Sequence, residues 1–186
     1  MANHGLIIES KIAAKDIDAL NRSVVCASAD VDGGSLLALT APSVKGEDRW
    51  TVAKPSASAL ADLWVAYNPT NRLMNVEGRE FANLSVDDRL YTNLQGKTFD
   101  AFKPKVGDEI EFSEDCIDPS ALEDLESGDF LESVADSFKL ARKSAQAGAT
   151  AGHTAFKVEF ATEHPLGAKG IGDTFFKTFR VVCVAE

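Results

Sequence analysis

Alternating apolar and polar residues near the end of the chain predict two strands of one sheet. In residues 156–160, Phe156, Val158 and Phe160 alternate with a lysine and a glutamate, and residues 178–184 follow much the same pattern. Side chains along a strand point to opposite faces in turn. The two segments therefore predict a sheet with one buried face, which carries Phe156, Val158 and Phe160, and one face in water.

Shorter apolar runs predict strands earlier in the chain, at 23–27, 35–40, 50–53, 63–67 and 109–112. The Asp-Gly-Gly sequence within 30–34 supplies residues that tolerate the positive φ of tight turns. We therefore expect a hairpin over 23–40. Residues 70–104 have weak periodicity and mixed polarity, and no element is assigned to them.

The segment 114–136 is acidic, with nine acidic residues and no basic one. Within it, residues 121–126 predict a short helix. Residues 130–141 fit both periods, since Phe130, Val134 and Phe138 have helical spacing, but we favour a strand at 137–141. The Ala- and Gly-rich stretch 144–154 is expected to be a loop.

These elements predict a mainly β protein, an antiparallel barrel or sandwich-like domain with one or two short helices. Residues 1–22 are expected to form an N-terminal arm or a short helix. Residues 23–186 are expected to form a single β-rich domain, with two β units at 23–112 and 113–186 as the alternative.

The formal net charge of −10 argues against nucleic acid as a partner, because phosphate binding needs a basic stripe that the sequence lacks. The same charge argues against an anionic membrane surface and suits a basic protein partner. No apolar run approaches the roughly 20 residues of a membrane span, and the first residues lack the charged start of a signal peptide. We expect no membrane association.

The motifs that carry chemistry in other proteins are incomplete here, and no catalytic, cofactor or metal site is predicted. Gly96-Lys97-Thr98 lacks the earlier glycine of a phosphate-binding loop. Asp30 and Asp32 begin like a calcium loop, but the glutamate that such a loop needs at its twelfth position is absent. The three cysteines, Cys26, Cys116 and Cys183, are widely spaced, which favours buried reduced thiols over a zinc site.

Two segments are candidates for contact with a partner protein. One is the glycine-rich loop that contains Gly167, Gly170 and Gly172, because such a loop at a strand tip allows close approach of a partner backbone. The other is the apolar run Leu6, Ile7 and Ile8 in the N-terminal arm, which would extend the contact on becoming ordered.

Four stretches of the chain resemble one family of viral proteins. They are His4–Lys11, Ala29–Leu39, Val106–Phe112 and Thr178–Val184, at the two ends and in the middle of the sequence. In them the chain resembles the head decoration, or cement, proteins of tailed bacteriophages.

The resemblance implies a non-enzymatic β-rich structural protein that is made in the host cytoplasm and sits on the capsid surface of the virion. There it would bind the major capsid protein and copies of itself, as a homo-oligomer, and stabilise the head. The acidic segment 114–136 is longer than the short members of the family would suggest.

Two other functions remain open at this point. A small-ligand or glycan-binding β-barrel would have a concave pocket lined by Trp or Tyr with convergent polar groups. An enzyme would need a site assembled in space, such as His153 or His164 beside carboxylates in a cleft.

Overall fold

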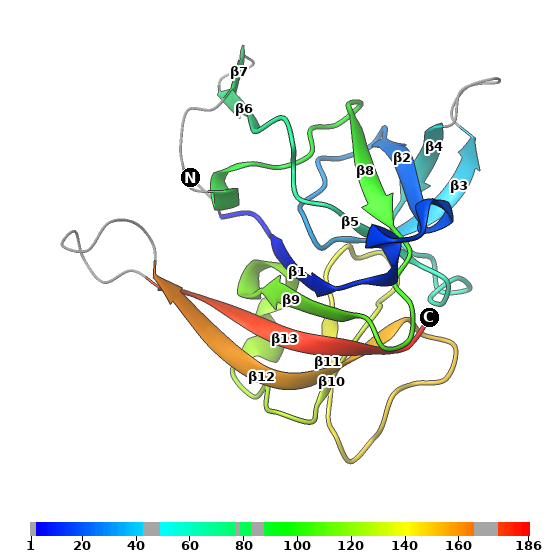
Figure 1. The fold of residues 1–186 in the computed structure, drawn as a ribbon, viewed down its shortest axis with the longest axis vertical. Helices are drawn as coiled ribbons and strands as arrows, with labels where there is room; N and C mark the ends of the chain where they lie inside the picture. The colour runs from blue at the N-terminus through cyan, green and yellow to red at the C-terminus, as the bar shows by residue number, and fades with distance from the viewer. Residues whose placement is uncertain (1–2, 43–48, 77–78, 83–87, 166–174) are drawn as a thin grey trace.

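The computed structural model describes residues 3–42, 49–76, 79–82, 88–165 and 175–186. It confirms the predicted mainly β class. Two units of sheet dominate it, a small barrel and an open sheet that packs against the barrel (Figure 1).

The barrel closes in the order β2-β4-β3-β5-β8. Its strands are β2 (Asn21–Cys26), β3 (Leu36–Pro42), β4 (Arg49–Ala53), β5 (Trp64–Ala66) and β8 (Thr98–Phe102). All neighbours are antiparallel except β2 and β4, which are parallel. Closure leaves this small sheet without an exposed edge.

The open sheet has the order β1-β9-β13-β12-β10-β11. Its strands are β1 (Ile7–Lys11), β9 (Glu109–Ser113), β10 (Phe130–Glu132), β11 (Ala141–Lys143), β12 (Ala155–Pro165) and β13 (Phe175–Ala185). A separate hairpin joins β6 (Leu73–Val76) to β7 (Arg79–Ala82). The helical elements are one turn of α-helix, α1 (Pro119–Leu122), and 3-10 turns at Ala13–Lys15, Asp18–Leu20, Asp88–Leu90 and Glu114–Cys116.

Barrel strands separate two hydrophobic cores. Leu36 and Phe102 face the open sheet and pack in the larger core, together with Phe112 and Phe156. Their chain neighbours, such as Leu37, point the other way and fill the barrel interior. Successive side chains of one strand thus serve two cores, which explains why these strands are apolar at neighbouring positions.

The predicted strand 156–160 lies within β12, but the structure corrects the orientation of one residue. Phe156 and Val158 are 0% and 2% exposed, whereas Phe160 is 48% exposed. The register between β12 and β13 shifts between Val158 and Phe160. A bulge of this kind reverses the alternation of side chains, so Phe160 lies on the outer face beside Arg180.

The expected hairpin over 23–40 is wrong. β2 and β3 form as strands, but β4 lies between them in the barrel. The turn residues bind elsewhere, since the Asp30 carboxylate accepts from the Gln95 N–H at 2.7 Å and Val31 pairs with Asn93. The connection is therefore held by the loop before β8.

The N-terminal segment is part of the sheet and is not a separate arm. β1 pairs antiparallel with β9, and Leu6 and Ile7 are only 7% and 2% exposed. Residues 11–20, where a short helix was the alternative, contain two 3-10 turns and no α-helix. A run of only three apolar residues leads into a strand here because β9 supplies the partners for its backbone hydrogen bonds.

The remaining assignments shift along the chain. The only α-helical turn of the described residues is at 119–122, slightly before the predicted 121–126. The strand expected at 137–141 begins at Ala141, and β10 occupies the start of the disputed segment. β8 was not predicted at all.

Candidate functional site

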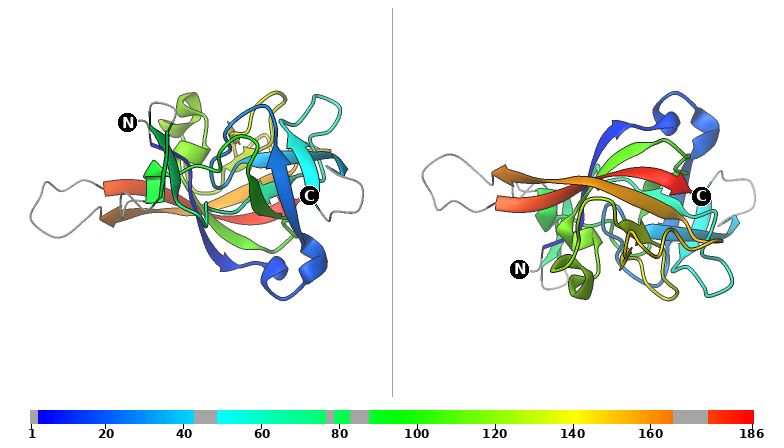
Figure 2. Two further views of the ribbon diagram at one scale, coloured as in Figure 1. Left: turned by 90° about the horizontal axis from the view of Figure 1, so that it is seen from above. Right: turned by 90° about the horizontal axis from the view of Figure 1, so that it is seen from below.

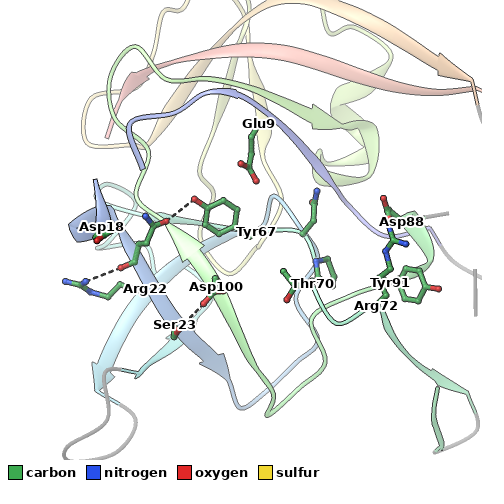
Figure 3. Close-up of a pocket in the computed structure, with 13 residues that line it drawn as sticks. Glu9, Asp18, Arg22, Ser23, Tyr67, Thr70, Arg72, Asp88, Tyr91 and Asp100 are labelled. Carbon is green, nitrogen blue, oxygen red and sulfur yellow. Dashed lines mark hydrogen bonds and ion pairs between the residues drawn. The ribbon is translucent and has the colours of Figure 1, made fainter. Parts of the chain in front are cut away.

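A cleft of about 870 Å³ lies between the open sheet and the barrel (Figure 3). β1 contributes Glu9 to one wall, and β2 and β8 contribute Ser23 and Asp100 to the opposite wall. The segment after β5, with Tyr67 and Thr70, supplies the rest of the centre. Four separate segments of the chain thus meet at one cleft.

Tyr67 lies near the middle of the cleft in Figure 3 and is held on two sides. Its hydroxyl donates to the Asn21 side-chain oxygen at 2.9 Å, and its ring centre is 4.8 Å from that of Phe102. Burial raises the pKa of Tyr67 to about 12, and the nearby carboxylates of Glu9 and Asp100 add to the effect. The phenol is therefore neutral and keeps its proton for the hydrogen bond.

The next residue, Asn68, ties β1 to this wall. Its side-chain oxygen accepts from the Ile7 N–H at 2.8 Å, and its NH₂ group donates to the Ile7 carbonyl at 2.7 Å. This pair of bonds imitates a backbone ladder. It fixes the position of β1 and so the position of Glu9 above the cleft.

The charged groups of the cleft have both signs. Asp100 accepts from the Ser23 hydroxyl at 2.9 Å, and Glu9 pairs with Lys15 at 3.3 Å. At one end of the cleft, Arg72 and Asp88 form an ion pair at 2.7 Å (Figure 3).

Arg22 and Asp18 occupy the other end. The Arg22 guanidinium donates to the Asn21 carbonyl at 3.1 Å and lies 5.8 Å from the centre of the Trp64 ring. Within the described ranges, neither Asp18 nor Asp100 has an ion-pair partner. The cleft therefore offers both hydrogen-bond donors and acceptors to a ligand.

Four carboxylates line the cleft: Glu9, Asp18, Asp88 and Asp100. Among the described residues, neither a histidine nor a cysteine lines it. In the part of the chain that the structure describes, no group of three or more His, Cys, Asp or Glu side chains could hold a metal ion. All three cysteines are free and buried.

His164 lies beside a carboxylate, but outside the cleft. Its Nε2 lies 2.9 Å from the Thr178 hydroxyl and 3.5 Å from Glu111 Oε2, and the Thr178 hydroxyl donates to the same Glu111 oxygen at 3.0 Å. The neighbours of these residues along β9 and β13, such as Phe112 and Phe179, fill the core. The histidine cluster therefore lies on the outer face of the sheet.

His153 is held mainly by a backbone contact. Its Nδ1 lies 3.0 Å from the Ser133 carbonyl oxygen and 4.0 Å from Glu132 Oε2. It does not line the cleft. The arrangement expected of an enzyme, a histidine beside carboxylates in a cleft, is thus absent from the cleft described here.

A second polar cluster joins the N-terminus to the barrel, and sequence reasoning missed it. His4 Nδ1 lies 2.8 Å from Asp32 Oδ1, to which the Thr92 hydroxyl also donates at 2.8 Å. The hydrogen bond to Asp32 raises the pKa of His4. Burial alone would raise the pKa of Asp32, but its bonds from His4, Thr92 and the Gly5 N–H lower it overall. Asp32 thus serves as a structural acceptor.

The residues proposed for partner contact have different outcomes. Leu6 and Ile7 are core residues, so their side chains are not available to a partner, and this expectation is corrected. Ile8 is half-buried and points to the outer face of the sheet beside Glu111. Gly167, Gly170 and Gly172 lie outside the described residues.

No helix in the described ranges is long and apolar enough to cross a membrane. Comparison of the chain with protein-family models, with curated proteins and with solved structures finds no match in any of the three.

Proposed function

We propose that this chain is a non-enzymatic structural protein of a virion, a capsid decoration protein. In this role it binds the major capsid protein and copies of itself on the capsid surface and stabilises the head. The family resemblance of the four sequence stretches gives the first support, and the observation that carries the proposal is the shape of the β12–β13 hairpin.

The hairpin extends beyond the body of the sheet as an arm (Figures 1 and 2). β10 pairs with β12 only up to Lys157, and β9 pairs with β13 only from Thr178 onward. The stretch of β12 from Ala161 to Pro165 therefore has β13 as its only strand partner among the described residues. Beyond the last β9–β13 pair, Thr178 with Ser113, the described hairpin continues for the three pairs between Glu163–Pro165 and Phe175–Lys177. At about 3.4 Å per residue this part reaches about 10 Å. Such an arm can span the boundary between neighbouring subunits of a shell.

A side chain suited to contact lies at the base of this arm. Phe160 is 48% exposed, and the Arg180 guanidinium lies 5.7 Å from its ring centre. Exposed aromatic side chains and arginines often carry much of the energy of an interface. We assign the outer face around Phe160 to the capsid contact.

The repeated surface of a shell makes weak individual contacts sufficient. A decoration protein is seated many times, and an oligomer engages several sites at once, which raises the overall affinity. The net charge of −10 keeps the free protein dispersed and favours a basic docking surface.

The proposal is tested by adding the purified chain to heads assembled without it and measuring the protein that sediments with them. Phe160→Ser is expected to weaken binding by about tenfold or more, since it removes an exposed aromatic contact. Phe81→Ser, on the β6–β7 hairpin and 39% exposed, is the matched control. Failure of the unmodified chain to sediment with heads contradicts the proposal, and equal losses for the two variants contradict the assigned face.

A second candidate function is supported by the cleft. A small-ligand or glycan-binding module requires a concave pocket with a tyrosine and convergent polar groups, and the cleft around Tyr67 meets that requirement. Separate assays distinguish the two functions, one for binding to heads in the absence of any small ligand and one for binding of a small ligand to the free chain. A ligand that raises the melting temperature while heads bind no protein favours this alternative over decoration.

A further inference from the structure

The cleft around Tyr67 has walls that are fixed before any ligand arrives. Asn21 and Phe102 hold the tyrosine ring, and Asn68 holds β1 through both polar groups of Ile7. Ser23 and Asp100 are cross-strand partners on β2 and β8. Pre-positioned polar groups of this kind reduce the entropy lost on binding.

The cleft offers neither a purely anionic nor a purely cationic site. A compact anion would face Asp18 and Asp100, which are not neutralised by any cation among the described residues. A compact cation would face Arg22, which likewise has no carboxylate partner there. A ligand group that both donates and accepts hydrogen bonds can pair with the carboxylates and with the guanidinium. Hydroxyl groups have this property.

The cleft also has apolar surface between its polar groups. The ring of Tyr67 lies near the centre of the cleft in Figure 3. Pro69 is also among the lining residues. Sugar rings match such a surface, because they have C–H faces bordered by hydroxyl groups. An aromatic ring provides a flat apolar contact at low conformational cost.

The extent of the cleft indicates more than one sugar unit. It runs from Asp18 and Arg22 at one end, past Tyr67, to Arg72 and Asp88 at the other (Figure 3). Its volume of about 870 Å³ lies toward the upper end of the range for ligand sites. A single sugar unit would leave most of it filled with water.

We propose that this cleft binds a neutral oligosaccharide, with Asp100 and Arg22 on its hydroxyl groups and Tyr67 against a sugar ring. The inference rests on the ligand-binding candidate above and is independent of head binding. It assigns a recognition role to residues that a purely structural protein would not need to place together.

The test is a glycan array probed with the full chain, carrying neutral oligosaccharides beside sialylated and sulfated ones, with an oligolysine peptide as the cationic comparator. Binding to at least one neutral oligosaccharide, then measured by calorimetry, is the expected result. Competition between the free oligosaccharide and an immobilised neutral polysaccharide distinguishes a short sugar from a polymer as the natural source.

Two variants locate the binding in the cleft. Asp100→Ala is expected to weaken it by about tenfold or more, because a charge-assisted hydrogen bond is lost. Thr70→Trp adds bulk at an exposed position of the cleft and is expected to abolish binding without removing an internal contact. Asp16→Ala is the matched control, since Asp16 is exposed on the neighbouring segment and does not line the cleft.

The proposal is overturned if no neutral oligosaccharide binds, if only the charged ligands bind, or if Asp100→Ala and Thr70→Trp both bind like the unmodified chain. Binding of only charged ligands retains the ligand-binding candidate while rejecting the saccharide. A chain that binds no array member yet sediments with heads loses the cleft proposal alone, so the two failures are distinguishable.

Discussion

Gly34 lies where the N-terminal strand, the barrel and the open sheet meet, and a single methyl group there probes that junction. Its φ is +80°, a conformation that costs an alanine about 1–2 kcal/mol. A Cβ at this position would lie 2.7 Å from Cys116 Sγ, 2.9 Å from Ile7 Cγ2 and 3.1 Å from a Phe112 ring carbon. Overpacking of this kind costs about 1–3 kcal/mol.

We therefore expect Gly34→Ala to lower the free energy of unfolding by about 2–5 kcal/mol. For a chain of this size the loss corresponds to a fall of about 5–15 °C in melting temperature. The measurement is urea unfolding followed by tryptophan fluorescence, with thermal unfolding by circular dichroism as a second probe.

Gly96→Ala is the matched control, because Gly96 has a φ of +74° but no neighbouring atom within 4 Å of the place that the alanine methyl group would take. In Gly96→Ala only the backbone conformation is unfavourable. We expect the free energy of unfolding to fall by about 1 kcal/mol, because the less flexible unfolded chain offsets part of that cost. If Gly34→Ala is no more destabilising than Gly96→Ala, β1 is not packed against the barrel junction as described.

Three further predictions concern the same region. Asn68→Ala removes both side-chain bonds to Ile7 and is expected to cost about 1–3 kcal/mol in urea unfolding; an unchanged midpoint would mean that β1 does not need this tether. The His4–Asp32 contact stabilises most between the ordinary pKa values of aspartate, near 3.8, and histidine, near 6.5. Its contribution is lost as pH rises through the raised pKa of His4, and as pH falls through the lowered pKa of Asp32. The stability lost in Asp32→Asn should therefore be larger at pH 5.5 than at pH 9, and a loss independent of pH would contradict the assignment. Burial raises the pKa of Cys116 to about 12, so its thiol should react with an aromatic disulfide reagent at pH 8 only after unfolding, and fast reaction of the native chain would refute its burial.

The strands that the sequence predicted best are those whose pairing follows from local pattern. β12 and β13 alternate strongly, and they form the longest pair in the described chain. The bulge after Val158 was not predictable, because Glu159 looks like any outward residue and the shift depends on pairing with β13. A shift of one residue places the Phe160 side chain on the outer face of the sheet instead of in the core.

Long-range pairing explains the other differences. The turn at 30–34 suggested a hairpin, but Asp32 bonds to His4 and Asp30 bonds to the loop before β8. Likewise, the burial of Ile7 depends on β9, about a hundred residues later. A single sequence carries no signal for such partners.

The candidate cleft was the least predictable feature. Nothing in the sequence distinguished Tyr67 from the other aromatic residues, or indicated that Glu9 and Asp100 would lie near it. Glu9 is on β1, Asp100 is on β8 and Tyr67 follows β5, and only the packing of sheet on barrel brings them together. The general form of a tyrosine-containing pocket was expected for a ligand-binding barrel, whereas its residues were not.

The most direct test of the decoration proposal is quantitative mass spectrometry of purified virions, because the proposal implies that a viral genome encodes this chain. The proposal predicts that the chain is present in a fixed ratio to the major capsid protein, and that particles treated to release it lose stability toward heat. Purified particles that contain the major capsid protein but none of this chain would contradict it.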